Sequence, residues 1–369
     1  FNGNGHTISH LTFKGVDCLG LFGRMKSPGK VMNLGVTDVN ITTSSGSYIG
    51  GLVGSGGGNV INCYSTGSIS GKKHVGGLVG NNPHGRLLNC YSTVEVNGNE
   101  CVGGLVGKND AGVVTACQSA GAVNGDQFVG GLVGNNKGQI FNCYSISAVK
   151  GQSNIGGLVG VNRGNIIMSY STGVVKGEED IGGLVGTNYG IDNVTLNYWD
   201  IETSGLMESD GGIGKTTAEM QSADTFLEAG WDFVDETANG TNDFWWILEG
   251  KDYPKLVRKL SACSPHPRDG ATRLQNTMTL SWKPGYHATM HQVYFGSDKN
   301  AVTNATRSSP EYKGSRILGS ESYDPGELQY LTTYYWRVDE INDQDPNDPI
   351  KGIIWSFTTD CFFVTVDDF

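Results

Sequence analysis

The stretch that most resembles a catalytic motif is glycine-rich and ends in a lysine and two threonines, residues 211–217 (Gly-Gly-Ile-Gly-Lys-Thr-Thr). A phosphate-binding loop also needs a glycine five residues before its Gly-Lys-Ser/Thr end. That position is Ser209 here, and no hydrophobic strand precedes it. We therefore expect a structural role instead, in which Thr216 or Thr217 caps a short helix that begins at Thr217.

Histidines and acids do not converge on a catalytic pattern. None of the seven histidines lies in an HExxH zinc motif. His287 and His291 are four residues apart, but His291 is expected to begin a strand, so the pair would not share a helix face. Charges in the N-terminal half are scattered, and the densest run, residues 178–180, lies at an expected turn. Since glycosidic bond cleavage needs a facing pair of acids, the sequence favours a chain that is not an enzyme and carries no cofactor.

Oxygen-bearing side chains crowd one loop of the C-terminal part. Asp343, Asp345 and Asn347 are hard ligands of the kind that calcium prefers. The EF-hand pattern that would start at Asp343 fails, because Asp348 replaces its glycine and Ile354 its closing glutamate. The default interpretation is a solvated acidic loop, and a calcium site is the alternative.

Four of the eight cysteines recur at a spacing of 26 or 27 residues: Cys63, Cys90, Cys117 and Cys143. No cysteine belongs to a CxxC pair, which argues against zinc-ribbon and thioredoxin-like sites. Three interpretations stay open, namely a row of small buried thiols, disulfides between neighbours, or a metal-binding row. Ser169 takes the same place in the next repeat, which fits packing better than chemistry.

The cysteines belong to a repeat that organises the first half of the chain. Its most regular element is the hexapeptide [IV]-Gly-Gly-Leu-Val-Gly, which occurs six times: at Ile49–Gly54, Val75–Gly80, Val102–Gly107, Val129–Gly134, Ile155–Gly160 and Ile181–Gly186. An Asn-Cys-Tyr-Ser-like block and a short β-branched block follow in each repeat. Fixed periods of this length are typical of stacked supersecondary units.

These blocks are short, rich in valine, isoleucine, tyrosine and threonine, and bounded by glycine or asparagine, as strands are. Three strands per repeat and no helix predict an all-β fold, a parallel β-helix whose coils are 26–27 residues long. Crossovers between parallel strands are nearly always right-handed, so we expect a right-handed solenoid over residues 1–200 with the motif leucine pointing inward. Stacking then turns equal positions into ladders. One ladder should contain the asparagines two residues past the motif: Asn82, Asn109, Asn136, Asn162 and Asn188.

The GGLVG and NCYSTG blocks resemble the GLUG-motif repeats of secreted bacterial surface proteins. The resemblance covers roughly residues 1–200, and it implies a β-helix with an extracellular or cell-surface location and no particular reaction.

Residues 201–258 are rich in aromatic side chains and are similar to the segment that often closes GLUG arrays. We expect this segment to cap the open end of the solenoid. As an alternative, exposed rings could form a platform for sugars: Trp231, Trp245, Trp246 and Tyr253.

A proline-marked linker at residues 261–267 separates a C-terminal module, which we place at residues 259–360. It contains four strand-like runs: Met278–Trp282, Gln292–Phe295, Thr333–Val338 and Ile353–Thr358. This spacing predicts an immunoglobulin-like β-sandwich. The region around Leu328, Thr332 and Tyr334 resembles the tyrosine corner of fibronectin type III domains. Residues 361–369 would begin a further segment, and a disulfide between the flanking Cys263 and Cys361 would have to span the length of the sandwich.

Composition narrows the choice of partners. Glycine accounts for 56 of 369 residues, and the net charge is −11, which argues against nucleic acid or an anionic membrane as a partner. No apolar run reaches the length of a membrane span. We expect part of a longer non-catalytic surface protein, a stalk or filament that contacts other surface proteins, itself or extracellular glycans. The alternative is the carbohydrate-binding or spacer region of a secreted polysaccharide-active enzyme.

Overall fold

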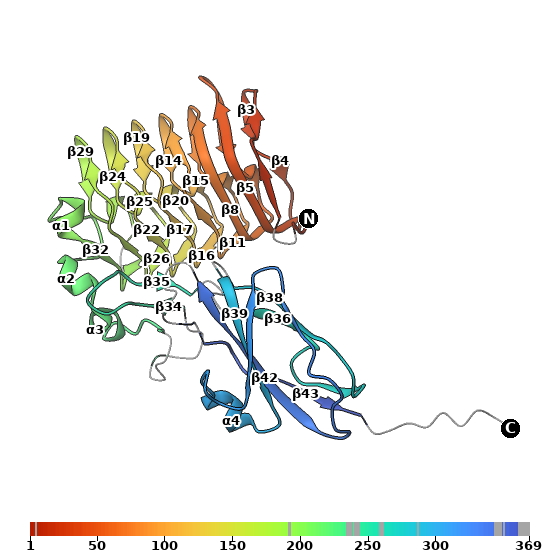
Figure 1. Cartoon of the computed structure of the whole chain (residues 1–369). Helices are drawn as coiled ribbons and strands as arrows, with labels where there is room; N and C mark the ends of the chain where they lie inside the picture. Colours follow the sequence, from red (N-terminus) through yellow and green to blue (C-terminus); the bar gives the residue numbers. More distant parts are fainter. Residues whose placement is uncertain are drawn as a thin grey trace. The chain divides into compact units, whose positions relative to one another are not determined.

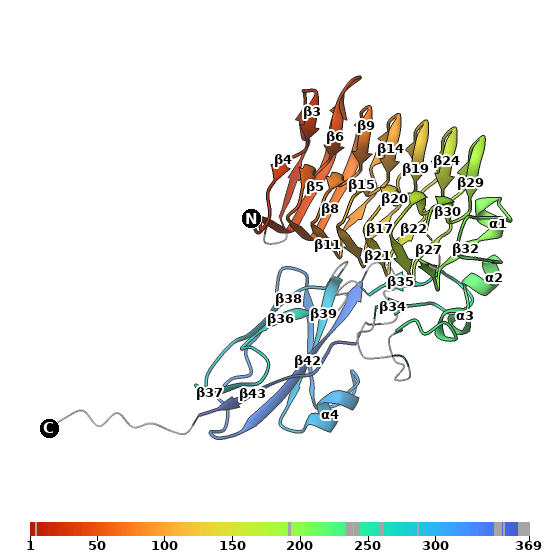
Figure 2. The same ribbon diagram turned by 180° about the vertical axis from the view of Figure 1, so that it is seen from behind.

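The computed structural model describes residues 1–3, 6–190, 193–233, 239, 244–257, 262–285, 288–342, 349 and 351–360. The chain divides into two compact units, Phe1–Leu256 and Val257–Phe369. The first is a solenoid of stacked parallel strands (Figures 1 and 2). The prediction of an all-β fold is confirmed, and the longest of the described helices, α4 (Lys299–Asn304), has six residues.

Two seven-stranded parallel sheets form two sides of the solenoid. Sheet B contains β3 (Asp17–Leu19), β6 (Ser47–Gly50), β9 (Lys73–Gly76), β14 (Glu100–Gly103), β19 (Gln127–Gly130), β24 (Ser153–Gly156) and β29 (Glu179–Gly182). Sheet C contains β4 (Phe22–Met25), β7 (Val53–Gly56), β10 (Val79–Asn82), β15 (Val106–Asn109), β20 (Val133–Asn136), β25 (Val159–Asn162) and β30 (Val185–Asn188). Neighbouring strands pair at equivalent positions, for example Val102 with Val129 and Gly103 with Gly130.

The remaining side, sheet A, has nineteen strands, of which all but β5 and β8 have two or three residues. They are β1 (Thr7–Ser9), β2 (Thr12–Phe13), β5 (Lys30–Thr42), β8 (Asn59–Ser70), β11 (Arg86–Leu88), β12 (Tyr91–Ser92), β13 (Glu95–Asn97), β16 (Val113–Thr115), β17 (Gln118–Ser119), β18 (Val123–Asn124), β21 (Gln139–Phe141), β22 (Tyr144–Ser145), β23 (Val149–Lys150), β26 (Asn165–Ile167), β27 (Tyr170–Ser171), β28 (Val175–Lys176), β31 (Val194–Thr195), β32 (Tyr198–Asp200) and β33 (Ile213–Lys215).

A regular coil therefore has five short strands, β9 to β13 for instance, where the sequence predicted three. The glycine motif supplies two of them, because its Gly-Leu pair turns the chain from sheet B into sheet C. At this corner the backbone passes close to itself, and a Cβ added to Gly103 would lie 2.0 Å from the carbonyl oxygen of Val106. In sheet A, Asn89 adopts a left-handed conformation (φ 54°), which bends the chain between β11 and β12.

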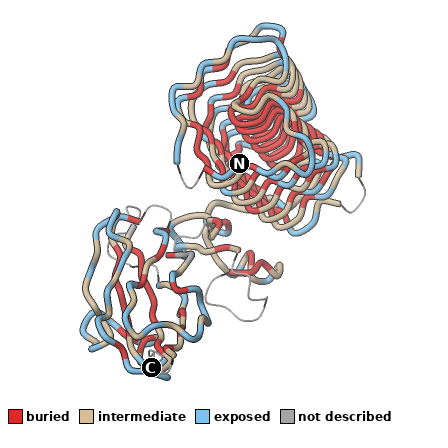
Figure 3. The backbone as a smooth tube through the Cα atoms, turned by 90° about the vertical axis from the view of Figure 1, so that its right-hand side faces the viewer, coloured by how far each residue is buried: buried red, intermediate tan, exposed pale blue. Residues whose placement is uncertain are grey.

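The core lies inside the coils, where the buried positions stack in continuous rows (Figure 3). The motif leucines point inward as predicted and are fully buried in all six copies: Leu52, Leu78, Leu105, Leu132, Leu158 and Leu184. The isoleucine or valine at the first position of the motif and the valine at its fifth position join them. Because one coil cannot bury its own inner face, this core exists only through stacking.

The segment after residue 200 covers two surfaces, the end of the main core and the outer side of sheet A. It contains α1 (Ile201–Ser204), α2 (Thr217–Met220), α3 (Ala223–Leu227) and the antiparallel pair β34 (Trp245–Trp246) and β35 (Lys255–Leu256). The end of the main core is closed by Trp199, Ile201 and Leu206. The aromatic residues of the segment instead form a second core against the outer side of sheet A, where Tyr144, Tyr170 and Tyr198 lie in one row.

The second unit contains two small sheets. One has β36 (Cys263–His266), β38 (Leu280–Lys283) and β41 (Ser322–Tyr323). The other has β37 (Ala271–Leu274), β39 (Ala288–Gly296), β40 (Tyr312–Ile317), β42 (Thr333–Asn342) and β43 (Trp355–Thr359). All pairs are antiparallel except β37 with β43. The sheets share a core around Trp282, Trp336 and Trp355, so the predicted sandwich is confirmed in part.

Candidate functional site

The predicted asparagine row is formed by the last residues of the sheet C strands, and its amides form a chain along the solenoid. Each Nδ2 donates to Oδ1 of the next coil, at 2.9 Å from Asn82 to Asn109, 2.8 Å to Asn136, 2.8 Å to Asn162 and 3.0 Å to Asn188. The same amides also bond to backbone groups of their own turns, as when Asn136 Oδ1 accepts from the Gly138 amide at 3.2 Å. Asn82 to Asn162 are completely buried. The row therefore holds coils together and offers no free group to a ligand.

The structure adds a second asparagine row that the sequence reasoning missed. Asn33 donates to Asn2 at 3.1 Å, Asn62 to Asn33 at 2.9 Å, and Asn89 to Asn62 at 3.2 Å. Asn33, Asn62 and Asn89 all have φ between 52° and 54°, a conformation that asparagine tolerates better than most residues. Part of the signal was present in the sequence as the asparagine directly before Cys63 and before Cys90.

The four repeated cysteines are free, fully buried thiols that point into the core. Each donates back to the carbonyl two residues earlier, at 3.3 Å from Cys63 to Ile61 for example. Ser169 makes the same bond to Ile167 at 3.0 Å, which explains why serine can replace cysteine. Burial, the largest cause, raises the pKa of Cys63 to about 12, so this thiol stays protonated at neutral pH.

Two of the four rings predicted as a sugar platform are buried, which contradicts that prediction for them. Trp231 and Trp245 are completely buried, with ring centroids 4.7 Å apart in the second core, and cannot present a face to a sugar. Trp246 and Tyr253 are half-buried. The Lys255 ammonium lies 5.5 Å above the Trp246 ring, and the Tyr253 hydroxyl donates to Asp200. Trp231 and Trp245 therefore belong to the packing against the aromatic row of sheet A, whereas Trp246 and Tyr253 stay predictions.

Asp200, which the sequence analysis did not single out, is the polar centre of this segment. It is fully buried at the end of β32. Its Oδ1 accepts from the backbone amides of Glu202 and Thr203, and its Oδ2 from the Thr217 and Tyr253 hydroxyls, both at 2.7 Å. One carboxylate thus fixes α1, the start of α2 and the segment before β35. Burial is the largest cause that raises the pKa of Tyr253 to about 12, and the bond to Asp200 adds to it.

The glycine-rich stretch 211–217 is part of the solenoid. Residues 213–215 form β33, which pairs in parallel with β32. Thr216 caps α2 in a reciprocal capping box with Glu219, and Lys215 forms an ion pair with Glu219 at 3.1 Å. The predicted helix start is confirmed, and the lysine that would contact phosphate is occupied by a carboxylate.

In the second unit, the calcium candidates Asp343, Asp345 and Asn347 lie outside the described residues, as do His287 and Cys361. His291 is completely buried in β39. Its Nδ1 lies 2.6 Å from Glu340 and its Nε2 3.1 Å from Glu321. Burial disfavours the imidazolium, but the two carboxylates outweigh it, so the pKa of His291 is raised. These three side chains form an internal ion-pair network. The sequence did not predict it, because Glu321 and Glu340 lie 30 and 49 residues after His291.

Over the described part of the chain, no three His, Cys, Asp or Glu side chains come together as a set that could hold a metal ion. None of the described helices is long and apolar enough to cross a membrane. Burial raises the pKa of Cys90, Cys117 and Tyr170 well above the usual values, and all three side chains lie in cores.

Comparisons with known protein sequences identify the same repeat. The model of the GLUG motif matches residues 45–70 and 98–124. Halomucin of Haloquadratum walsbyi (strain DSM 16790 / HBSQ001) is 38% identical over 81 residues. That stretch is 21% of this chain and only 1% of halomucin, so the chain spans a very small part of this relative. No solved structure is significantly similar to the chain. GLUG repeats on a β-solenoid are features that suggest a surface or structural protein.

Proposed function

We propose that the chain is a non-catalytic segment of an extracellular or cell-surface protein, in which the solenoid is a stalk and the second unit a fibronectin type III-like spacer. The observation that carries this proposal is how the repeated residues are used. The motif leucines, the cysteines and the inner asparagines are buried and contact their counterparts in adjacent coils. Repetition therefore serves stacking, whereas a catalytic site would need one coil to differ from the rest.

The spacer assignment is supported by a bond at the expected tyrosine corner. The Tyr334 hydroxyl accepts from the Gln329 backbone amide at 3.0 Å, a short reach backwards along the chain that is typical of this corner. Other surface proteins, copies of the chain or extracellular glycans are the partners that such a segment would have. The halomucin match supports the surface location.

Deletion of one whole coil tests the stalk. Removing residues 103–129 joins Val102 to Gly130, and the sequence at the junction stays Val-Gly-Gly. The variant should keep its far-ultraviolet circular dichroism per residue and its cooperative unfolding, because each coil contacts only its neighbours. A matched deletion of residues 110–136, which also removes 27 residues but joins Asn109 to Lys137, should behave alike.

Incubation of the full chain with a panel of polysaccharides, with release of new reducing or unsaturated ends as the readout, tests the absence of catalysis. No turnover is expected. Reproducible turnover that the coil deletion abolishes would show that the solenoid is itself an enzyme, and negative-stain images full of fibres would replace the stalk by a filament.

A further inference from the structure

The last regular coil of the solenoid contains β29 in sheet B and β30 in sheet C, at the end that carries α1 (Figure 1). In the described part of the chain, no further strand of these sheets pairs with their outer edges. An edge of this kind presents backbone amides and carbonyls that can pair with a strand of another chain. Residues 206–210 (Leu-Met-Glu-Ser-Asp), which lie between α1 and β33 and are called the strap below, bond to this edge.

A serine of the strap takes the place of a further coil at the Gly-Leu corner. In the preceding coil, the amides of Leu158 and Val159 both donate to the carbonyl of Leu184, at 2.9 Å and 3.1 Å. In the last coil, the amides of Leu184 and Val185 both donate to Ser209 Oγ, at 3.1 Å and 2.9 Å. The serine hydroxyl therefore accepts the two bonds that a leucine carbonyl accepts one coil earlier.

The rest of the strap binds β30 at both of its ends. Asn188, the last residue of β30, donates its amide to Asp210 Oδ2 at 2.6 Å. The Asp210 amide donates to the carbonyl of Val185, the first residue of this strand, at 3.1 Å. At the corner before β30, the Gly183 amide donates to the carbonyl of Glu208 at 3.1 Å. The strap thus occupies backbone groups that a further strand would need.

The strap does not offer a new edge in return. Residues 206–210 form no strand, and several of their bonds to the solenoid come from the side chains of Ser209 and Asp210. Leu206 packs against the main core, whereas Met207, Glu208 and Asp210 are exposed. The solvent side of the strap therefore lacks the regular row of backbone amides and carbonyls that strand pairing needs.

The neighbouring edges are short or charged. β33, which pairs with β32 in sheet A, has only three residues. In β29, both Glu179 and Asp180 are exposed acids. Short edge strands and charged side chains are common means by which proteins prevent pairing at sheet edges.

We propose that the strap ends strand addition at this end of the solenoid and thereby prevents a second copy of the chain from stacking on it. The second copy would have to place β3 and β4, the first strands of sheets B and C, against β29 and β30. Such a contact joins unlike ends, so without the strap it would repeat and build an open filament. The inference goes beyond the stalk role, because a stalk could equally be built from stacked copies.

Hydrogen–deuterium exchange of the full chain, resolved to single amides, tests whether the strap replaces a coil. In the parent chain, the amides of Leu184 and Val185 should be protected, as those of Leu158 and Val159 are. Ser209→Ala should accelerate exchange at Leu184 and Val185 by about tenfold or more, because it removes their acceptor, and should leave the preceding coil unchanged.

Ser222→Ala is the matched control for this experiment. Ser222 is also half-buried in the segment after the solenoid, but its side chain makes no capping bond to α3. The control should leave the exchange of all four amides within about twofold of the parent.

Sedimentation velocity at rising protein concentration tests whether the strap prevents stacking. The parent and the Ser222→Ala control should sediment as one species at every concentration. S209A/D210A should associate as the concentration rises, and negative-stain images should show rods that lengthen along the solenoid axis. Circular dichroism checks that this variant is folded. If it is not, Asp210→Ala takes its place, which frees only the Asn188 amide and should associate at higher concentration.

The proposal is overturned if the parent itself forms lengthening rods, or if Ser209→Ala leaves exchange at Leu184 and Val185 unchanged. It is also overturned if the folded strap variant stays a single species at all concentrations, since the strap is then not what prevents stacking. Association side by side, without longer rods, would contradict the end-to-end contact.

Discussion

Replacement of Asn136 by alanine tests whether the buried amide row holds the solenoid together. The change removes two inter-coil bonds of 2.8 Å each, to Asn109 and Asn162, and it takes the acceptor away from the Gly138 amide. A hydrogen bond contributes about 1 kcal/mol net, and a buried donor left unpaired costs about 1–3 kcal/mol. We therefore expect a loss of about 3–5 kcal/mol in the free energy of unfolding.

Two control variants make this number interpretable. Asn188→Ala, at the half-buried end of the row, removes a single inter-coil bond of 3.0 Å and should cost about 1 kcal/mol. Asn165→Ala changes an exposed side chain of β26 and should cost less than about 0.5 kcal/mol.

Urea unfolding of the full chain, followed by hydrogen–deuterium exchange of peptides from residues 130–165, measures the effect. Exchange should accelerate most in Asn136→Ala and least in Asn165→Ala. If Asn136→Ala and Asn165→Ala unfold at the same urea concentration and exchange at the same rates, the asparagine row does not stabilise the solenoid and the reasoning is wrong.

Three further predictions follow from the contacts of buried polar groups. Because the pKa of His291 is raised, its ion pairs contribute stability that is complete below an unfolded pKa of about 6.5 and is lost as the pH rises through the folded value. The melting temperature of the second unit should therefore fall as the pH is raised above neutrality, and the slope should flatten in His291→Gln. Tyr253→Phe deletes the 2.7 Å bond to Asp200 and should cost about 1–2 kcal/mol, seen as faster limited proteolysis after residue 216, with Asp200→Ala more severe. The native chain should resist alkylation at the fully buried Cys117 until urea unfolds it, whereas the half-buried Cys18 should react before Cys117 does. Fast labelling of Cys117 in the native chain would contradict the packing.

Much of the solenoid could be predicted from the sequence, because stacking makes contacts between distant residues periodic along the chain. A residue such as Leu105 packs on its equivalents at Leu78 and Leu132, so one repeat describes the surroundings of the next. The inner asparagine row and the cysteine row followed from the same logic.

Contacts outside the repeat could not be predicted from the sequence in this way. The role of Trp231 and Trp245 depends on sheet A, whose outer tyrosine row offers them an apolar surface. A count of aromatic residues predicts burial and exposure equally well, because both an end cap and a sugar platform need rings. The network of His291, Glu321 and Glu340 likewise depends on how β39, β41 and β42 meet.

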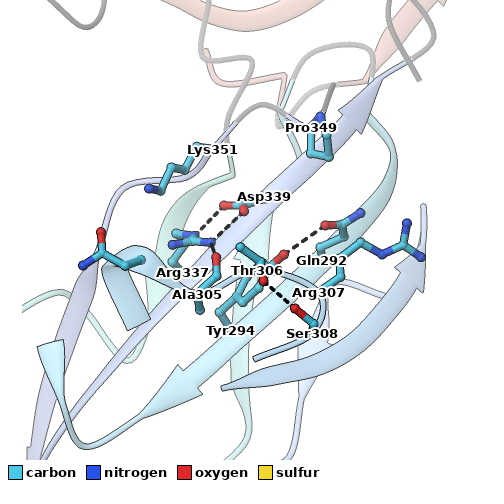
Figure 4. Close-up of a pocket in the computed structure, with 11 residues that line it drawn as sticks. Gln292, Tyr294, Ala305, Thr306, Arg307, Ser308, Arg337, Asp339, Pro349 and Lys351 are labelled. Carbon is cyan, nitrogen blue, oxygen red and sulfur yellow. Dashed lines mark hydrogen bonds and ion pairs between the residues drawn. The ribbon is translucent and has the colours of Figure 1, made fainter. Parts of the chain in front are cut away.

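Arg337 is a second case in the same unit. Its guanidinium binds Asp339, two residues further along β42, and also the carbonyl of Ala305, which follows α4 (Figure 4). Ala305 lies 32 residues before Arg337 in the sequence, so no local pattern predicts this bond.

By itself, the sequence determined the coil, its period, its inward leucines and the ladders, since these follow from a local pattern repeated at one spacing. Only the tertiary structure decided that the Gly-Leu pair is a corner between two sheets and that the aromatic segment covers the side of sheet A. The physical reason is that a contact between equivalent positions recurs in every repeat and leaves a periodic pattern in the sequence. A contact that occurs only once joins two unrelated segments and leaves no such pattern.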